Sequence, residues 1–169
     1  MQFGPATPGV CLLGREAAIG ASKAGQAGTA RMRQLVAQVA AELKPEQDAI
    51  IQENNALEAV RKTLPAAQFQ QRGAQLQQRA QAFNQLRQLR AAQISRTKAL
   101  VEQQIAQAID PLMGPIIAAR KCSVVFERTT TYGSNPALDL TPAVVQALDQ
   151  RMPTIQFNLA TPQSVQGGQ

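Results

Sequence analysis

A heptad repeat constrains this chain more than any other feature of its sequence. In the first half, apolar residues recur every seven positions, and a companion position lies three residues after each of them. The repeated residues are Val36, Leu43, Ile50, Leu57 and Leu64, with Met32, Val39 and Val60 as companions. This spacing predicts a long helix with a coiled-coil seam. Two companion positions hold Glu46 and Glu53 instead, which predicts loose packing in the middle of the seam.

A second helical run follows a break at residues 63–65. Pro65 cannot donate to the helical ladder and restricts the residue before it, so we place a hairpin tip there. The apolar residues of the second run are Phe69, Leu76 and Phe83, spaced by seven, then Ile94 eleven positions later, then Val101 and Ile105. The change from seven to eleven predicts a local loss of left-handed supercoil. Residues 23–119 therefore form an antiparallel helical hairpin.

Prolines mark two places where this hairpin is expected to flex. Pro45 lies off the seam, where it removes one hydrogen bond and bends the helix without ending it. Near the end of the second run, Asp110-Pro111 and Gly114-Pro115 interrupt the helical pattern, which resumes at Ile116. We predict hinges at Pro45, Pro111 and Pro115.

The residues outside the hairpin predict a small α+β body. Short apolar runs at residues 10–13 and 122–126 predict strands, residues 129–132 predict a third strand, and residues 138–140 a further strand or extended link. Residues 15–20 predict a short helix, and Ser22 an N-cap for the long helix. Thr141 is expected to cap the last helix, with Pro142 in its first position.

This pattern divides the chain into three predicted parts. Residues 1–22 and 120–150 form a β-rich body, residues 23–119 form the coiled-coil hairpin that projects from it, and residues 151–169 form a flexible tail. With no tryptophan, one tyrosine and five phenylalanines, the body has a poor core for a monomer. We therefore expect association with copies of the same chain to complete it.

Positive charge is concentrated on the second arm of the hairpin. The chain has a formal net charge of +6 and a sequence pI near 10.0. Between residues 66 and 109 a single acid, Glu102, accompanies six cations. These are Arg72, Arg79, Arg87, Arg90, Arg96 and Lys98. A basic surface favours acidic partners, which include nucleic acid, an anionic lipid surface and acidic polypeptides.

The sequence lacks the motifs of most enzymes. It has no histidine, no glycine-rich phosphate loop and no nucleophile elbow, so we predict neither an enzyme nor a cofactor. Without histidine or a close cysteine pair, no metal site is expected. Cys11 and Cys122 are able to pair, but their spacing does not imply it, and we expect buried free thiols.

Hydropathy and the N-terminal residues give two interpretations of location. No apolar stretch is long enough to cross a membrane, and the first twenty residues do not have the pattern of a secretory signal. The chain is therefore either cytoplasmic or a mature form whose signal has been removed and replaced by Met1.

Four short motifs, in this order and spacing, resemble the Skp (OmpH-like) family of periplasmic chaperones. They are Ser22-Lys23-Ala24-Gly25, Leu43-Lys44-Pro45, Ser123-Val124-Val125-Phe126 and Leu138-Asp139-Leu140-Thr141. The resemblance covers residues 10–148. Gly14, Lys121-Cys122 and the tail after Met152 depart from the family pattern, but none of these lies in the hairpin.

The resemblance implies an ATP-independent holdase that binds unfolded outer-membrane proteins. Three chains would form a jellyfish-like homotrimer, with client proteins held in a cavity between three helical tentacles. The body positions expected at the shared interface are Val10, Leu12, Val124, Phe126, Leu138 and Leu140. The positions expected to bind clients are Phe69, Arg72, Leu76, Arg79, Phe83, Arg87, Arg90, Arg96 and Lys98.

Two other classes of protein fit part of the pattern. A structural or nucleic-acid-binding coiled coil would use the basic helix to follow phosphates. However, the arm has no dense Lys/Arg cluster and few aromatic residues for stacking bases, so we expect no specific nucleic acid. A prefoldin-like cytoplasmic chaperone would share the helical hairpin and differ in the body.

Overall fold

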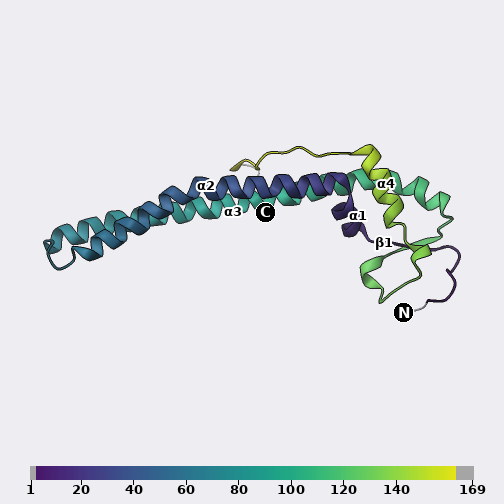
Figure 1. Cartoon of the computed structure of the whole chain (residues 1–169), viewed down its shortest axis with the longest axis horizontal. Helices are drawn as coiled ribbons and strands as arrows, with labels where there is room; N and C mark the ends of the chain where they lie inside the picture. Colours follow the sequence, from purple (N-terminus) through teal and green to yellow (C-terminus); the bar gives the residue numbers. More distant parts are fainter. Residues whose placement is uncertain (1–2, 163–169) are drawn as a thin grey trace. The chain divides into compact units, whose positions relative to one another are not determined.

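The computed structural model describes residues 3–162, and most of them are helical. The elements are β1 (Val10–Leu13), α1 (Arg15–Ala21), α2 (Lys23–Ala59), α3 (Ala66–Ala119), β2 (Val124–Glu127), two 3₁₀ helices (Arg128–Thr130 and Pro136–Leu138) and α4 (Thr141–Arg151). Figure 1 shows their order along the chain. The chain forms two compact units. We call residues 1–32 and 98–157 the sheet unit and residues 33–97 and 158–169 the hairpin unit.

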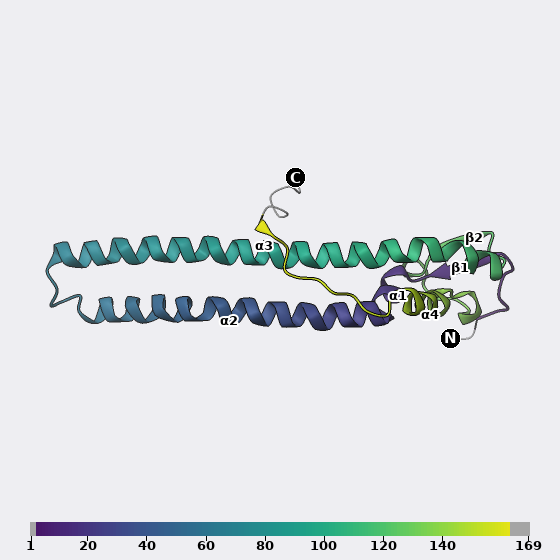
Figure 2. The ribbon, with the colours of Figure 1, turned by 90° about the horizontal axis from the view of Figure 1, so that it is seen from above.

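The hairpin unit contains antiparallel stretches of α2 and α3 (Figure 2). α2 continues through Pro45 and ends at Ala59, and α3 begins at Ala66. In the tip between them, the N–H groups of Thr63 and Leu64 donate to the Val60 carbonyl at 3.0 and 2.9 Å. The predicted helical hairpin and the position of its tip are therefore confirmed.

The predicted seam of the hairpin is confirmed over most of its length. The buried apolar side chains include Val39, Leu57, Leu76 and Phe83, which are 7–8% exposed. At the start of the seam the prediction is wrong, because Val36 is 44% exposed and Leu35 is buried in its place. An α-helix has 3.6 residues per turn, so a strict seven-residue stripe drifts around it and moves to a neighbouring position.

α3 runs without a break to Ala119, although it contains Pro111 and Pro115. The predicted interruption at residues 110–115 is therefore wrong. A proline inside a helix removes one donor and displaces one carbonyl, which a long helix accommodates by bending. Flexing at Pro45, Pro111 and Pro115 stays a prediction.

The sheet unit contains two parallel strands, with Val10 of β1 opposite Val124 of β2 and Leu12 opposite Phe126. Parallel strands need a long crossover, and here α1, α2 and α3 lie between them in the sequence. The pairing brings Cys11 within 5.8 Å of Cys122, Cα to Cα, and the two form a disulfide. The expectation of free thiols is therefore wrong, because strand pairing joins cysteines that are 111 positions apart.

The core of the sheet unit lies among β1, α3 and α4. Its most deeply buried large side chains are Ile105, Ile109, Leu140, Val144 and Leu148, each no more than 2% exposed. The predicted N-cap of α2 is confirmed, because the Gly25 N–H donates to Ser22 Oγ at 3.0 Å. A Cβ atom at Gly25 would overlap the Ile19 carbonyl, so this position requires glycine for the close approach of α1.

The body predicted as β-rich has less sheet than expected. Among residues 3–162, β1 and β2 form a two-stranded sheet, and Asp139 adds a single bridge to Leu12. The strand predicted at 129–132 is wrong, since residues 128–130 form a 3₁₀ helix in which the Glu127 carboxylate accepts from the Thr129 N–H. A side chain that bonds its own backbone competes with a strand ladder in this way.

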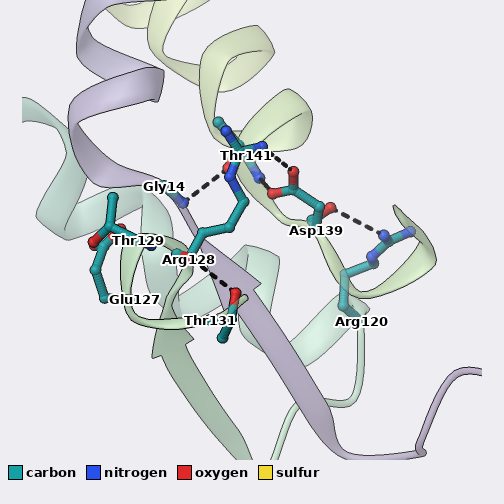
Figure 3. Close-up of polar contacts among 8 residues, drawn as sticks. All are labelled: Gly14, Arg120, Glu127, Arg128, Thr129, Thr131, Asp139 and Thr141. Atoms are coloured by element: carbon teal, nitrogen blue, oxygen red, sulfur yellow. Dashed lines mark hydrogen bonds and ion pairs between the residues drawn. The ribbon is translucent and has the colours of Figure 1, made fainter. Parts of the chain in front are cut away.

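Polar contacts link β1 to the start of α4 (Figure 3). Asp139 accepts from the Thr141 N–H at 2.8 Å and from Arg128 at 2.8 Å. Thr141 Oγ1 accepts from the Gly14 N–H at 2.9 Å, so this hydroxyl joins two segments far apart in the sequence. The predicted helix is confirmed over Thr141–Arg151, but Thr141 does not cap it and lies inside it.

Part of the predicted tail has ordered contacts. Ile155 is 6% exposed and belongs to the core of the sheet unit, and the Phe157 carbonyl accepts from Arg31 at 3.3 Å. In the hairpin unit, the backbone of Ala160 makes hydrogen bonds to α3. The predicted flexibility of 151–162 stays a prediction, and residues 163–169 lie outside the described residues.

Candidate functional site

Two of the six predicted cations face carboxylates of α2. Arg79 donates to Glu46 at 2.6 and 2.7 Å and to Glu53 at 2.9 Å. Arg90 donates to Glu42 at 2.6 Å. These ion pairs join the two helices of the hairpin, so the charge of Arg79 and Arg90 is largely compensated within the chain.

Arg79 binds the two acids that interrupt the apolar seam, and the expectation of loose packing there stays a prediction. Glu46 and Glu53 occupy seam positions as predicted, but one guanidinium from the facing helix binds both carboxylates. The hydrogen bond from Arg79 holds the pKa of Glu46 below its usual range, against the opposing effect of burial. The same hydrogen bond raises the pKa of Arg79. The middle of the seam is thus held together by charged groups.

The remaining cations are more accessible to a binding partner. Arg72, Arg87 and Arg96 are exposed, and within residues 3–162 no carboxylate pairs with them. Arg87 lies over the Phe83 ring at 5.9 Å from the centroid. Lys98, in the sheet unit, lies 3.8 Å from Glu102, a long contact between exposed groups. The uncompensated positive charge of the hairpin unit on α3 therefore comes from Arg72, Arg87 and Arg96.

The predicted apolar contact residues lie mostly inside the hairpin. Leu76 and Phe83 are each 8% exposed, and Phe69 is half-buried with Arg61 over its ring at 5.8 Å. Toward the tip, however, the two helices line an open groove of about 460 Å³. Its lining residues are Ile50, Ile51, Asn54, Leu57, Glu58, Phe69, Gly73, Leu76, Gln77 and Ala80.

Ile51 and Gly73 are groove residues that the sequence prediction missed. Ile51 is 50% exposed, so it presents apolar surface that the seam residues do not. A Cβ atom at Gly73 would meet nothing within 4 Å, so this position leaves the groove open. The signal in the sequence was the Ile50-Ile51 pair, since only one of two adjacent residues can face the seam.

The six residues predicted for a shared body fall into three groups. Leu12 and Leu140 are buried within the chain at 3% and 0% exposure. Val10 and Leu138 are half-buried. Val124 and Phe126 on β2 are 39% and 50% exposed, so the single chain leaves their side chains largely uncovered.

Residues 3–162 contain neither a metal-binding cluster nor a helix able to cross a membrane. No three His, Cys, Asp or Glu side chains among residues 3–162 gather into a group able to bind a metal ion. None of the helices formed by these residues combines the length and apolar character needed to cross a membrane.

Comparison with known proteins decides the family. The family model described as Outer membrane protein (OmpH-like) matches residues 10–148, from β1 to the buried Leu148 of α4. The chain belongs to the OmpH-like family. The resemblance found in the sequence is thus confirmed, and OmpH-like proteins are non-enzymatic chaperones for outer membrane proteins.

A solved structure shares the fold over almost the whole chain. It is the crystal structure of an OmpH-like protein from Caulobacter crescentus CB15, described as a candidate outer membrane chaperone. The two sequences are 35% identical, the match covers 95% of each chain, and the TM-score is 0.83. No curated protein sequence matches this chain. The OmpH-like fold therefore extends beyond the four short motifs to the full helical hairpin.

Proposed function

We propose that this OmpH-like chain is an ATP-independent holdase that keeps unfolded outer-membrane β-barrel proteins from aggregating in the periplasm. The observation that carries the proposal is the family match over residues 10–148, together with a hairpin unit that leaves an apolar groove open. The disulfide between Cys11 and Cys122 supports the location, because disulfides persist in oxidising compartments such as the periplasm.

The hairpin is suited to holding a client by many weak contacts. Its groove is open rather than enclosed, and its exposed apolar area is limited to side chains such as Ile51. The exposed Arg72, Arg87 and Arg96 would attract acidic segments over distances of about 10 Å at roughly 0.1 M salt. Attraction of this kind mainly accelerates association. Attachment to an anionic lipid surface would use the same cations and stays a prediction.

A homotrimer would complete the sheet unit and form the cavity in which the client is held. Val124 and Phe126 leave apolar surface exposed, and among residues 3–162 no further strand pairs with the outer edge of β2, so strands of other chains can add there. Burial of one such side chain is worth roughly 1.5–3 kcal/mol. Light scattering should give three times the chain mass, and a monomer at micromolar concentration would contradict the trimer.

The test of the holdase function is suppression of aggregation. An outer-membrane β-barrel protein is diluted from denaturant with and without this chain, and turbidity is followed by light scattering. The proposal expects suppression that needs no nucleotide. Unchanged aggregation at molar excess of the trimer would contradict it.

The contribution of positive charge to client capture is tested with a matched pair of variants. Replacing Arg72, Arg87 and Arg96 by glutamine removes the uncompensated cations and should slow client capture at low salt. Replacing Arg79 and Glu46 together by glutamine removes one charge of each sign and leaves the net charge unchanged, so capture should stay close to the parent rate. Stopped-flow fluorescence of a labelled client measures both rates. Equal rates for the parent and the first variant would leave only the apolar contacts to explain capture.

A further inference from the structure

Two buried polar side chains on α3 bind the backbone of a single residue. Gln93 and Thr97 are 3% and 2% exposed. The Gln93 Nε2 group donates to the Ala160 carbonyl at 2.6 Å, and the Ala160 N–H donates to Thr97 Oγ1 at 2.8 Å. Both backbone groups of Ala160 are therefore bound by side chains one helical turn apart.

Neighbouring contacts fix the orientation of both side chains. Arg90, held by Glu42, donates to Gln93 Oε1 at 2.8 Å, so the amide nitrogen of Gln93 is left to face a carbonyl. Thr97 Oγ1 donates its hydrogen to the Gln93 carbonyl at 2.7 Å and so offers a lone pair to an N–H. The pair thus presents one fixed donor and one fixed acceptor.

This arrangement fits an extended backbone. In a hydrogen-bonded pair of an antiparallel sheet, the N–H and C=O of one residue point to the same neighbour. Gln93 and Thr97 offer the matching groups from a helix, in place of a neighbouring strand. Because both hydrogen bonds to Ala160 involve its backbone, they do not select a side chain at the bound position.

The bound segment has the pattern of an amphipathic strand. Apolar and polar residues alternate over 155–159, which read Ile-Gln-Phe-Asn-Leu. Ile155 is buried, Phe157 and Leu159 are half-buried, and Gln156 and Asn158 are exposed. Strands of transmembrane β-barrels alternate in the same way. The segment is therefore of the same chemical kind as a strand of a β-barrel client.

We propose that Arg90, Gln93 and Thr97 form a site that binds one residue of an extended polypeptide, and that segment 154–160 is its internal ligand. A client strand would bind there by displacing this segment. The role of the client rests on the proposed function, whereas binding of an extended peptide does not.

The test uses the full-length chain and a labelled peptide with the sequence of residues 154–160. Ala160→Pro removes the N–H group that donates to Thr97 Oγ1, and so weakens the binding of the internal segment. Gln156→Pro is the control, because the Gln156 side chain is exposed and its N–H makes no hydrogen bond among the described residues. The Thr97→Val change removes the acceptor itself, and Thr97→Ser restores it.

In fluorescence anisotropy, the parent should bind the peptide weakly, because its own segment competes at an effective concentration on the order of millimolar. Ala160→Pro should bind about 2- to 10-fold more tightly, the range that corresponds to one net hydrogen bond. Adding Thr97→Val should reverse this gain, and adding Thr97→Ser should not. Circular dichroism of each variant reports whether the helices are kept.

Two results would overturn the proposal. One is that Ala160→Pro binds the peptide with the same affinity whether or not it also carries Thr97→Val, while the variant with Thr97→Ser keeps its helices. The other is a gain from Gln156→Pro as large as that from Ala160→Pro. Since the peptide is this chain's own sequence, failure of the aggregation test would remove the holdase function and leave this result standing.

Discussion

The sheet unit and the hairpin unit bury their apolar side chains to different depths. In the sheet unit, Ile109, Leu140 and Leu148 are completely buried, and a disulfide adds a covalent link. In the hairpin unit, the best-buried seam residues keep 6–8% exposure, and ion pairs span the helices. Two helices without a third layer leave the apolar side chains of the seam partly accessible to solvent. Stability is therefore concentrated in the sheet unit, whereas the hairpin unit offers the surface for binding.

The largest effect is expected on removing the disulfide. Replacing both Cys11 and Cys122 by serine should lower the free energy of unfolding by about 2–5 kcal/mol, because the crosslink closes a long loop in the unfolded chain. Guanidinium denaturation followed by circular dichroism measures the change. Reductant should destabilise the parent by a similar amount and leave the serine variant unaffected. Equal stability of parent and variant would show that the link adds nothing to the sheet unit.

Truncating one leucine in each unit tests the comparison directly. Leu148→Ala opens a cavity in a closed core and should cost about 3 kcal/mol. Leu57 lies at a seam that can collapse or admit water, so Leu57→Ala should lower the free energy of unfolding by about half as much. Urea denaturation of the two variants gives both values. A larger loss for Leu57→Ala would reverse the assignment of stability to the two units.

A smaller effect is expected from the Asp139 carboxylate. Burial acts to raise the pKa of Asp139, but hydrogen bonds from Thr141 and Arg128 outweigh burial and hold it below its usual value. A carboxyl group whose pKa falls on folding stabilises the protein above its unfolded pKa, so this contribution should be lost as pH drops below about 4. Asp139→Asn should cost about 1 kcal/mol at pH 7.

The pH dependence of this variant provides the check. Thermal unfolding of Asp139→Asn should change less between pH 6 and pH 3 than that of the parent. Identical pH profiles would show that other carboxylates account for the acid sensitivity.

The smallest effect is expected at Arg79. It joins Glu46 and Glu53 across the hairpin, but all three side chains are 39–47% exposed, so water and salt weaken the pairs. Arg79→Gln should lower the melting temperature slightly at low salt and not at high salt. Arg72→Gln is the matched control, because no ion pair of Arg72 was found in residues 3–162. A salt-independent loss would mean that Arg79 acts through packing.

Local periodicity was enough to predict the helices, the tip and β1, because these features depend on neighbouring residues. Contacts between distant residues were harder to predict. Nothing near Cys11 or Cys122 indicates that β1 pairs with β2, so the disulfide was missed. The Arg79 pairs were within reach, since Glu46 lies 17 residues before Thr63 and Arg79 lies 16 after it. In an antiparallel hairpin, residues at equal sequence distances from the tip lie opposite each other, so Glu46 and Arg79 would have been predicted to pair.

The contact of Ala160 was missed for two reasons that are visible in the sequence. After Phe83 the apolar repeat is interrupted, but the seven-residue spacing continues through the polar residues Arg90 and Thr97. Buried polar residues at such positions indicate a polar partner, here the backbone of Ala160. In addition, the alternation over 155–159 predicts a strand-like segment. A composition rich in glycine and proline at the end of the chain obscured it.

The disulfide also changes what a single proteolytic cut can do. Cys11 and Cys122 enclose α1, α2 and α3, so the whole hairpin lies within one covalent ring. A protease that cleaves once at the exposed tip, near Arg61, opens this ring but releases neither arm. Both fragments stay on one molecule until the bond is reduced. An OmpH-like chain of this kind can therefore lose the continuity of its tip and still keep both helices of the hairpin.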